Sequence, residues 1–306
     1  MPKSTQDITV SQIRYFLRTA ELGSMTEAAG ELYVAQSAVS TAIAQLEDTL
    51  GCQLLIRRRS RGVVLTEQGR NFYHGALEVM LTLDDAVNSV HPSVITGHLT
   101  AGIFTTLAPF WLPEVHDSLR GSHPELAVRL HEVTADQIEP MLQRRELEIA
   151  LTYSFDYGRE VMFDPLCDAP IYAAVAPTSP FAARDSVTLQ ELVDEPLILL
   201  DLGKSSNYFL SLFRAADLQP RIHQRFESFE VVRSMVARGH GFTILNQRPA
   251  HDLTNDGRRI IRVPLDGVPS GLQIGVAHRA DEQLSRKAEA FLATCRTVFD
   301  GGTDLP

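Results

Sequence analysis

The chain has 306 residues, of which 44% are hydrophobic and 22% charged, and its formal net charge is -10. These values are ordinary for globular proteins, and the length allows two or three domains. An acidic chain is not expected to coat nucleic acid over its whole surface, and no apolar run reaches the roughly 18 residues of a membrane span. Because the N-terminus does not resemble a signal peptide, we expect a cytoplasmic protein. Three widely separated cysteines lack the paired spacings that hold zinc, and they favour buried free thiols over a redox switch.

The first predicted helix lies near the N-terminus. Ile13, Phe16, Leu17 and Ala20 recur with the spacing of one buried helix face, and Gly23 ends the helix.

Two further short helices follow it. Ser24 and Glu27 fit a capping box that opens the second helix. After a turn at Tyr33 and Val34, a third helix has an apolar stripe formed by Val39, Ile43, Leu46 and Leu50. Two helices joined by so tight a turn predict a helix-turn-helix.

The polar face at the start of the third helix is a candidate DNA reader. Glutamine suits a bidentate contact with adenine, and hydroxyls bond to bases or phosphates. We therefore expect DNA contacts from Gln36, Ser37, Ser40 and Thr41. A merely solvated helix face is the alternative.

A basic hairpin follows the three helices. Residues 53–57 and 62–66 are expected to form two strands of a wing. The arginines near their junction are candidates for phosphate or minor-groove contacts, although exposure to water alone also explains them: Arg57, Arg58, Arg59 and Arg61.

The segment from Ile13 to Thr66 resembles the winged helix-turn-helix of LysR-type transcriptional regulators. The resemblance rests on an ordered run of residues: Phe16, Ala20, Ser24-Met25-Thr26-Glu27-Ala28-Ala29, Gln36-Ser37-Ala38-Val39-Ser40, Leu46-Glu47, Leu50-Gly51, Leu54-Leu55, Arg57, Leu65-Thr66 and Gly69. The chain departs from the family pattern at Ala35, where a Ser or Thr cap is common, at Leu55, where Phe is usual, and in a wing that is one residue longer.

A longer helix capped by Thr66 is predicted next. Its apolar residues alternate steps of four and three and form a heptad seam: Phe72, Ala76, Val79, Leu83, Ala86 and Val90. The seam favours pairing of two chains and a roughly two-fold symmetric DNA site, and packing against the same chain is the alternative. His91-Pro92-Ser93 is expected to break the helix and form a hinge.

Strand-like and helix-like segments alternate from about Ile95 onward, which predicts α/β architecture with mostly parallel sheets. The expected strands are residues 99–103, 127–132, 148–152, 171–176, 197–200, 221–226, 242–245 and 272–277. This layout resembles the two-lobed effector-binding domain of LysR-type regulators, which is similar to type 2 periplasmic binding proteins. The resemblance implies an effector site between the lobes.

The ligand is expected beyond the carboxyl ends of the strands. Hydroxyls, amides and one lysine at these ends favour an organic anion, such as a carboxylate, and aromatic side chains could cover an apolar part. The candidate residues are Thr105, Thr106, Thr134, Tyr153, Ser154, Lys204, Ser205, Ser206, Asn207 and Phe229. Taken singly, each also has a structural role as a helix cap, a core residue or a solvated side chain.

The sequence thus predicts a winged helix-turn-helix in residues 1–66, a linker helix and hinge in 67–93, and an effector-binding domain in 94–306. Lobe I is expected to comprise residues 94–168 and 271–306, and lobe II residues 169–270. The expected partners are promoter DNA, further copies of the same chain and a small-molecule effector. The copies are expected to form a homodimer and then a homotetramer, and RNA polymerase is a further candidate partner.

No catalytic motif, cofactor fingerprint or metal-binding spacing is found in the sequence. We therefore expect neither an enzyme nor a resident cofactor. The competing hypotheses are an architectural DNA-binding protein whose later half only assembles subunits, and an enzyme tethered to DNA.

Overall fold

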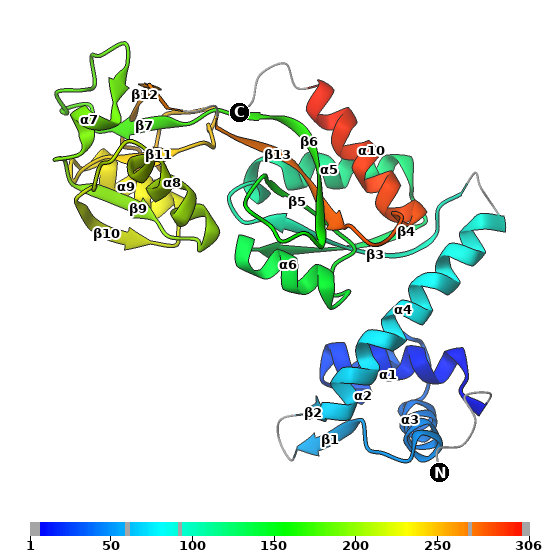
Figure 1. Ribbon diagram of the computed structural model, residues 1–306. Coiled ribbons are helices and arrows are strands. Elements are labelled where there is room, and N and C mark those ends of the chain that lie inside the picture. Colours follow the sequence, from blue (N-terminus) through cyan, green and yellow to red (C-terminus); the bar gives the residue numbers. More distant parts are fainter. Residues whose placement is uncertain (1–6, 59–61, 91–93, 269–270, 302–306) are drawn as a thin grey trace. The chain divides into compact units, whose positions relative to one another are not determined.

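The computed structural model describes residues 7–58, 62–90, 94–268 and 271–301. These residues form two compact units, one before and one after the segment 91–93 (Figure 1). The predicted hinge at 91–93 and the wing residues Arg59, Ser60 and Arg61 lie outside the described residues.

The first unit contains the predicted helices and hairpin in the expected order. Its elements are α1 (Val10–Leu22), α2 (Met25–Glu31), α3 (Gln36–Leu50), β1 (Leu55–Arg58), β2 (Gly62–Leu65) and α4 (Glu67–Val90). Phe16, Ala29, Val39 and Leu46 are buried in one core, so the apolar faces inferred from the spacing are the ones that pack together.

The helix starts of this unit differ in how they are capped. The Ser24 hydroxyl accepts a hydrogen bond from the Glu27 amide at 3.3 Å, and the Thr66 hydroxyl accepts one from the Gly69 amide at 2.8 Å. Ala35 offers no side-chain cap to α3. The orphan amides of α3 are therefore not satisfied by a capping side chain, which leaves the positive end of the helix dipole for another anion.

The wing is held to the helices by bonds to one side chain and to one backbone carbonyl. The β1–β2 pair is antiparallel, and the Glu47 carboxylate accepts the amides of Leu54 and Leu55 at 2.7 and 3.0 Å. The Val63 amide donates to the Gly23 carbonyl at 2.7 Å. Since Glu47 belongs to α3, its two bonds fix the start of the wing relative to that helix.

The first part of helix α4 packs against the core of this unit, and its later part is more exposed. Phe72 lies 5.3 Å from Phe16 between ring centroids, and Ala76 is buried in the same core. Val79 and Val90 are 48% and 70% exposed. The first two seam residues therefore pack against their own chain, the alternative considered above, and only the later part of the seam is exposed.

The second unit consists of two lobes. Lobe I has the sheet order β4-β3-β5-β13-β6. Its elements are β3 (Gly97–Phe104), α5 (Ala108–Ser122), β4 (Leu126–Val133), α6 (Ala135–Gln143), β5 (Ile149–Tyr153), β6 (Val161–Ala169), β13 (Leu272–Arg279) and α10 (Arg286–Gly301). Trp111 of α5 stacks on Phe299 of α10 at 4.0 Å between ring centroids.

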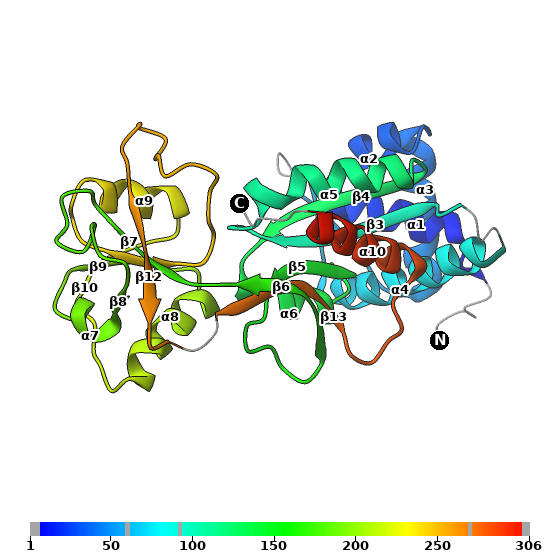
Figure 2. The same cartoon turned by 90° about the horizontal axis from the view of Figure 1, so that it is seen from above.

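Lobe II has a sheet of order β11-β7-β12-β8 and a separate pair, β10-β9. Its elements are β7 (Tyr172–Val175), β8 (Val187–Thr188), α7 (Leu189–Leu192), β9 (Leu197–Leu200), α8 (Lys204–Ala215), β10 (Ile222–Phe226), α9 (Phe229–Ala237), β11 (Thr243–Leu245) and β12 (Ile261–Asp266). The chain passes between the lobes twice, from β6 to β7 and from β12 to β13 (Figure 2).

The prediction of mostly parallel sheets needs a correction. β3, β4 and β5 are parallel, as are β9 and β10, but β13 runs antiparallel to both β5 and β6, and β7 runs antiparallel to β11 and β12. The antiparallel pairs β5–β13 and β7–β11 consist of predicted strands whose direction the periodicity does not reveal, and β6 and β12 add antiparallel pairs that the periodicity missed. β6 contains Pro165 and two aspartates, and β12 contains Pro264, residues that are depleted in strands.

Candidate functional site

The first half of α3 presents a polar face opposite its buried stripe. Gln36, Ser37 and Thr41 are exposed and Ser40 is half-buried, while Val39 and Ile43 are fully buried beneath them. The four predicted reading residues therefore share one outward surface. Their polar side chains and the uncapped helix start suit contacts with base edges and a phosphate.

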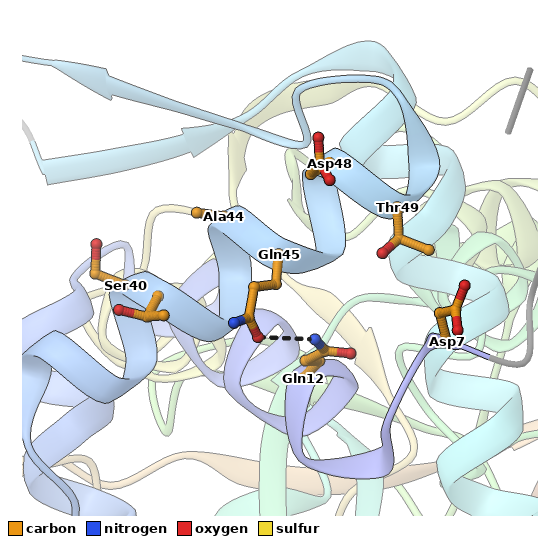
Figure 3. A pocket seen from close by; sticks show the side chains of 8 residues that line it. Asp7, Gln12, Ser40, Ala44, Gln45, Asp48 and Thr49 are labelled. Atoms are coloured by element: carbon orange, nitrogen blue, oxygen red, sulfur yellow. Dashed lines mark hydrogen bonds between the residues drawn. The ribbon is translucent and has the colours of Figure 1, made fainter. Parts of the chain in front are cut away.

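An open groove of about 640 Å³ runs along the same helix. Its lining residues are Asp7, Gln12, Ser40, Thr41, Ala44, Gln45, Asp48 and Thr49. The Gln12 amide donates to the Gln45 side-chain oxygen at 3.4 Å, and Figure 3 shows these two side chains facing each other. Gln45 was not predicted as a site residue; its exposure one turn after Thr41 is the signal that could have found it.

The groove also carries two carboxylates. Asp7 and Asp48 lie on its lining and repel the phosphates of a duplex. The electrostatics of α3 thus favour DNA contact near Gln36 and disfavour phosphate contact near Asp48.

Of the wing arginines, Arg57 and Arg58 belong to β1, where their backbones pair with Val63 and Gly62. Arg59 and Arg61 lie outside the described residues. The hairpin that carries Arg57 and Arg58 is the one that Glu47 ties to α3.

In the second unit, the predicted ligand residues of lobe I are partly used by the fold. The Ser154 hydroxyl accepts the Gln273 amide at 2.9 Å, and the Thr134 hydroxyl and amide bond to the Gln137 side chain at 3.2 and 2.9 Å. The Thr105 amide donates to the Val133 carbonyl. These contacts match the structural alternatives that the sequence left open for these residues.

Thr106 and Tyr153 take part in a hydrogen-bond chain between the lobes. The buried Thr106 bonds to the Tyr153 hydroxyl, which in turn donates to the Gln247 side chain of lobe II at 3.1 Å. The Tyr172 hydroxyl donates to the Gln247 carbonyl at 2.7 Å. Burial raises the pKa of Tyr172 to about 12 and that of Tyr153 above its usual range, so both hydroxyls remain proton donors at neutral pH.

Lys204, the predicted cation of the ligand site, already has protein partners. Its ammonium lies 3.2 Å from the Glu139 carboxylate and 2.6 Å from the Asp156 carbonyl of lobe I, and 4.9 Å from the Tyr157 ring centroid. A β-carbon at Gly203 would meet the Asp136 carboxylate. The start of α8 therefore receives two carboxylates from α6, which oppose a further anion there.

The other predicted residues of lobe II have varied surroundings. Ser205 and Ser206 are buried, and the Ser206 hydroxyl donates to the Gly203 carbonyl at 2.8 Å. Asn207 is exposed. The Phe229 ring lies 6.2 Å from that of Phe110 in lobe I, a second aromatic contact across the lobes.

Arg248 is a cation that the sequence reasoning missed. Its guanidinium lies over the Tyr172 ring at 5.6 Å, and its buried Nε has no hydrogen-bond partner among the described residues. Nearby Arg233 and Arg262 are paired with Glu230 at 2.8 Å and Asp252 at 2.7 Å. Arg248 lies just beyond the carboxyl end of β11. The expectation that ligands bind beyond strand ends, which identified the other candidates, would therefore also have identified Arg248.

The described residues contain neither a candidate metal site nor a candidate membrane span. Among them, no cluster of His, Cys, Asp or Glu is arranged to hold a metal ion. None of their helices has the length and apolar character needed to cross a membrane.

Comparison with known proteins identifies both halves of the chain. Residues 10–70 match the family model of the bacterial regulatory helix-turn-helix protein, lysR family, and residues 93–300 match that of the LysR substrate binding domain. The DNA-binding transcriptional dual regulator OxyR of Escherichia coli (strain K12) is 27% identical over 302 residues, which cover 97% of this chain and 98% of OxyR. The uncharacterized regulator YvbU of Bacillus subtilis (strain 168) is 28% identical over 95% of this chain and 99% of its own length.

Solved structures agree with these matches. HinK, a LysR family transcriptional regulator from Pseudomonas aeruginosa, is 33% identical with a TM-score of 0.63, covering 95% of this chain and 98% of HinK. A full-length OxyR variant from the same organism shares the fold, with 23% identity, a TM-score of 0.74 and 94% of each chain covered.

The match over residues 93–300 does not favour a later half that only assembles subunits, since it is to a ligand-binding domain. Proteins of this family are oligomeric regulators rather than enzymes, as the sequence predicts. The chain therefore belongs to the LysR family of DNA-binding transcriptional regulators, in which a helix-turn-helix is joined to an effector-binding domain.

Proposed function

We propose that this regulator reads promoter DNA with the first half of α3 and flanks that contact with its wing. The reading residues are Gln36, Ser37, Ser40 and Thr41, and the phosphate or minor-groove contacts come from Arg57, Arg58, Arg59 and Arg61. The observation that carries the proposal is the exposed polar face of α3 next to an uncapped helix start. The carboxylates of Asp7 and Asp48 confine the contact to this half of the helix.

The assembly follows from the exposed part of α4. Pairing of two chains through Val79, Leu83, Ala86 and Val90 would place two reading helices on one duplex. Two such dimers would then pair to form a tetramer. The complex would act in the cytoplasm. The exposure of Val79 and Val90 supports this arrangement, because apolar side chains on an isolated helix are stabilised by a partner. RNA polymerase is the further partner through which such a complex would act.

The effector in this proposal is a small organic anion held between the lobes. Arg248 would pair with its carboxylate, since it is the cation near the lobe junction that lacks a carboxylate partner among the described residues. Thr106, Tyr153 and Phe229 would contact the rest of the ligand, together with Thr105, Thr134, Ser154, Ser205, Ser206 and Asn207 where their side chains become available. Lys204 would take part only after separation from Glu139.

A selection of duplexes from a random pool by the full-length protein tests the DNA-reading role. We expect a pseudo-palindromic sequence, and we expect Gln36→Ala to weaken binding about 10-fold and relax the preference at one base pair per half-site. Gln224→Ala removes an exposed glutamine of lobe II and is the matched control. Failure of the unmodified protein to select any sequence would refute the proposal.

A further inference from the structure

Tyr33 has an unusual position in the turn between α2 and α3. Its side chain is 95% exposed, more than any other large hydrophobic side chain in the described part of the chain. Its backbone has a φ of 53°, in the left-handed region that a β-carbon disfavours. The phenol has no hydrogen-bond partner among the described residues.

The turn itself has the hydrogen bonds of a Schellman motif. The Val34 amide donates to the Ala29 carbonyl at 3.0 Å, and the Tyr33 amide donates to the Gly30 carbonyl at 3.3 Å. Val34 also packs against the core that contains Ala29, which is the apolar contact typical of this motif. The residue in the left-handed position of such a turn is usually Gly, because Gly adopts it without strain.

The Tyr33 side chain therefore contributes nothing visible to the fold at a position where it is unfavourable. Two other non-glycine residues with positive φ differ from it. Arg145 pairs with Glu282, and Asp217 is a short polar residue of the kind that tolerates this conformation. Tyr33 combines the strain with a bulky, unpartnered side chain, and it lies three residues before Gln36 at the start of the reading face.

We propose that Tyr33 is a DNA-backbone contact: its hydroxyl donates a hydrogen bond to a phosphate beside the N-terminus of α3, and its ring lies on the adjoining sugar. A phenol provides an uncharged donor on an apolar ring, which matches a phosphate oxygen next to a deoxyribose. The uncapped start of α3 attracts the same phosphate. This inference rests on the proposed reading role of α3. A contact between Tyr33 and the DNA backbone would fix how deeply α3 enters the major groove.

The test uses the full-length protein, the duplex selected by it, and the variants Tyr33→Phe and Tyr33→Asn. Tyr33→Phe keeps the ring and is expected to weaken binding about 10-fold, the lower end of the effect of one hydrogen bond to a charged group. Tyr33→Asn removes the ring and introduces a residue that tolerates the left-handed backbone. We expect it to lower the DNA affinity about 20-fold without lowering the melting temperature of the protein. The slope of affinity against salt concentration should stay unchanged, because an uncharged donor releases no counterion.

Duplexes with single methylphosphonate linkages locate the contact. One linkage per half-site should weaken the unmodified protein but have a smaller effect on Tyr33→Phe, since the same hydrogen bond has already been removed. The inference would be overturned if both variants bound DNA with an affinity within twofold of that of the unmodified protein. It would also be overturned if the variants changed the oligomeric state of the protein and left its DNA affinity unchanged. If Gln36→Ala loses affinity while the Tyr33 variants do not, only this inference fails; if the unmodified protein selects no duplex, the reading role itself fails.

Discussion

At the scale of single residues, pairing decides which side chains remain available for a ligand. Lys204 and Arg248 are both cations near the lobe junction, but Lys204 has Glu139 at 3.2 Å, whereas Arg248 has only the Tyr172 ring among the described residues. This difference could not be predicted from local sequence, because Glu139 lies 65 positions from Lys204. Strand-end position predicts where a ligand site lies, and tertiary pairing determines which residue can serve it.

Cys167 allows a pH-dependent prediction. Burial, with a further contribution from Asp168, raises the pKa of its thiol to about 11. A thiol with a raised pKa stays protonated at neutral pH and becomes a reactive thiolate only as the pH approaches that value. In a variant with Cys52→Ser and Cys295→Ser, alkylation of Cys167 by iodoacetamide should therefore be slow at pH 7 and rise steadily to above pH 10.

Mass spectrometry of the alkylated peptide over this pH range measures the effect, with free cysteine as the reference. A reaction midpoint below about 8.5, the value of an unperturbed thiol, would contradict the prediction.

At the scale of elements, the periodicity predicted every helix of the first unit and the strands with uninterrupted apolar runs. It missed the two-residue strand β8 and the longer strands β6 and β12, which each contain a proline and are mostly only partly buried. Such strands are recognised by their partners in the sheet, β13 and β7, which a local pattern does not include. The seam of α4 shows a similar limit, because the spacing of Phe72 and Ala76 does not distinguish a partner chain from Phe16 of the same chain.

Helix α4 carries the prediction that belongs to this scale. Val79→Glu together with Val90→Glu should convert the dimer into a monomer at micromolar concentration, because both valines belong to the seam and are 48% and 70% exposed, and a charge there opposes burial in a seam. Thr82→Glu introduces the same charge at an exposed position of the helix beside the seam and is the control. Sedimentation equilibrium measures the mass; an unchanged dimer in the double variant would exclude this seam.

At the scale of the whole molecule, the function depends on coupling between the effector-binding domain and the DNA reader. The lobes meet through the Lys204–Glu139 ion pair, the Phe110–Phe229 contact and the Tyr153–Gln247 hydrogen bond. A ligand alters the balance between lobe arrangements only if it binds one of them more tightly than the other. Arg248 is adjacent to Gln247, so in the proposed function an anion that pairs with Arg248 acts on this junction.

The most direct test is the dissociation constant of the full-length protein for its selected duplex, measured without an effector and with a saturating organic carboxylate identified by thermal shift. We expect the carboxylate to change this constant by about 5- to 150-fold, and the duplex to change the carboxylate affinity by the same factor. Arg248→Gln should bind DNA normally but lose this response, and Arg214→Gln, an exposed arginine of α8, should retain it. An unchanged dissociation constant with every carboxylate that binds, or a full response in Arg248→Gln, would contradict the account.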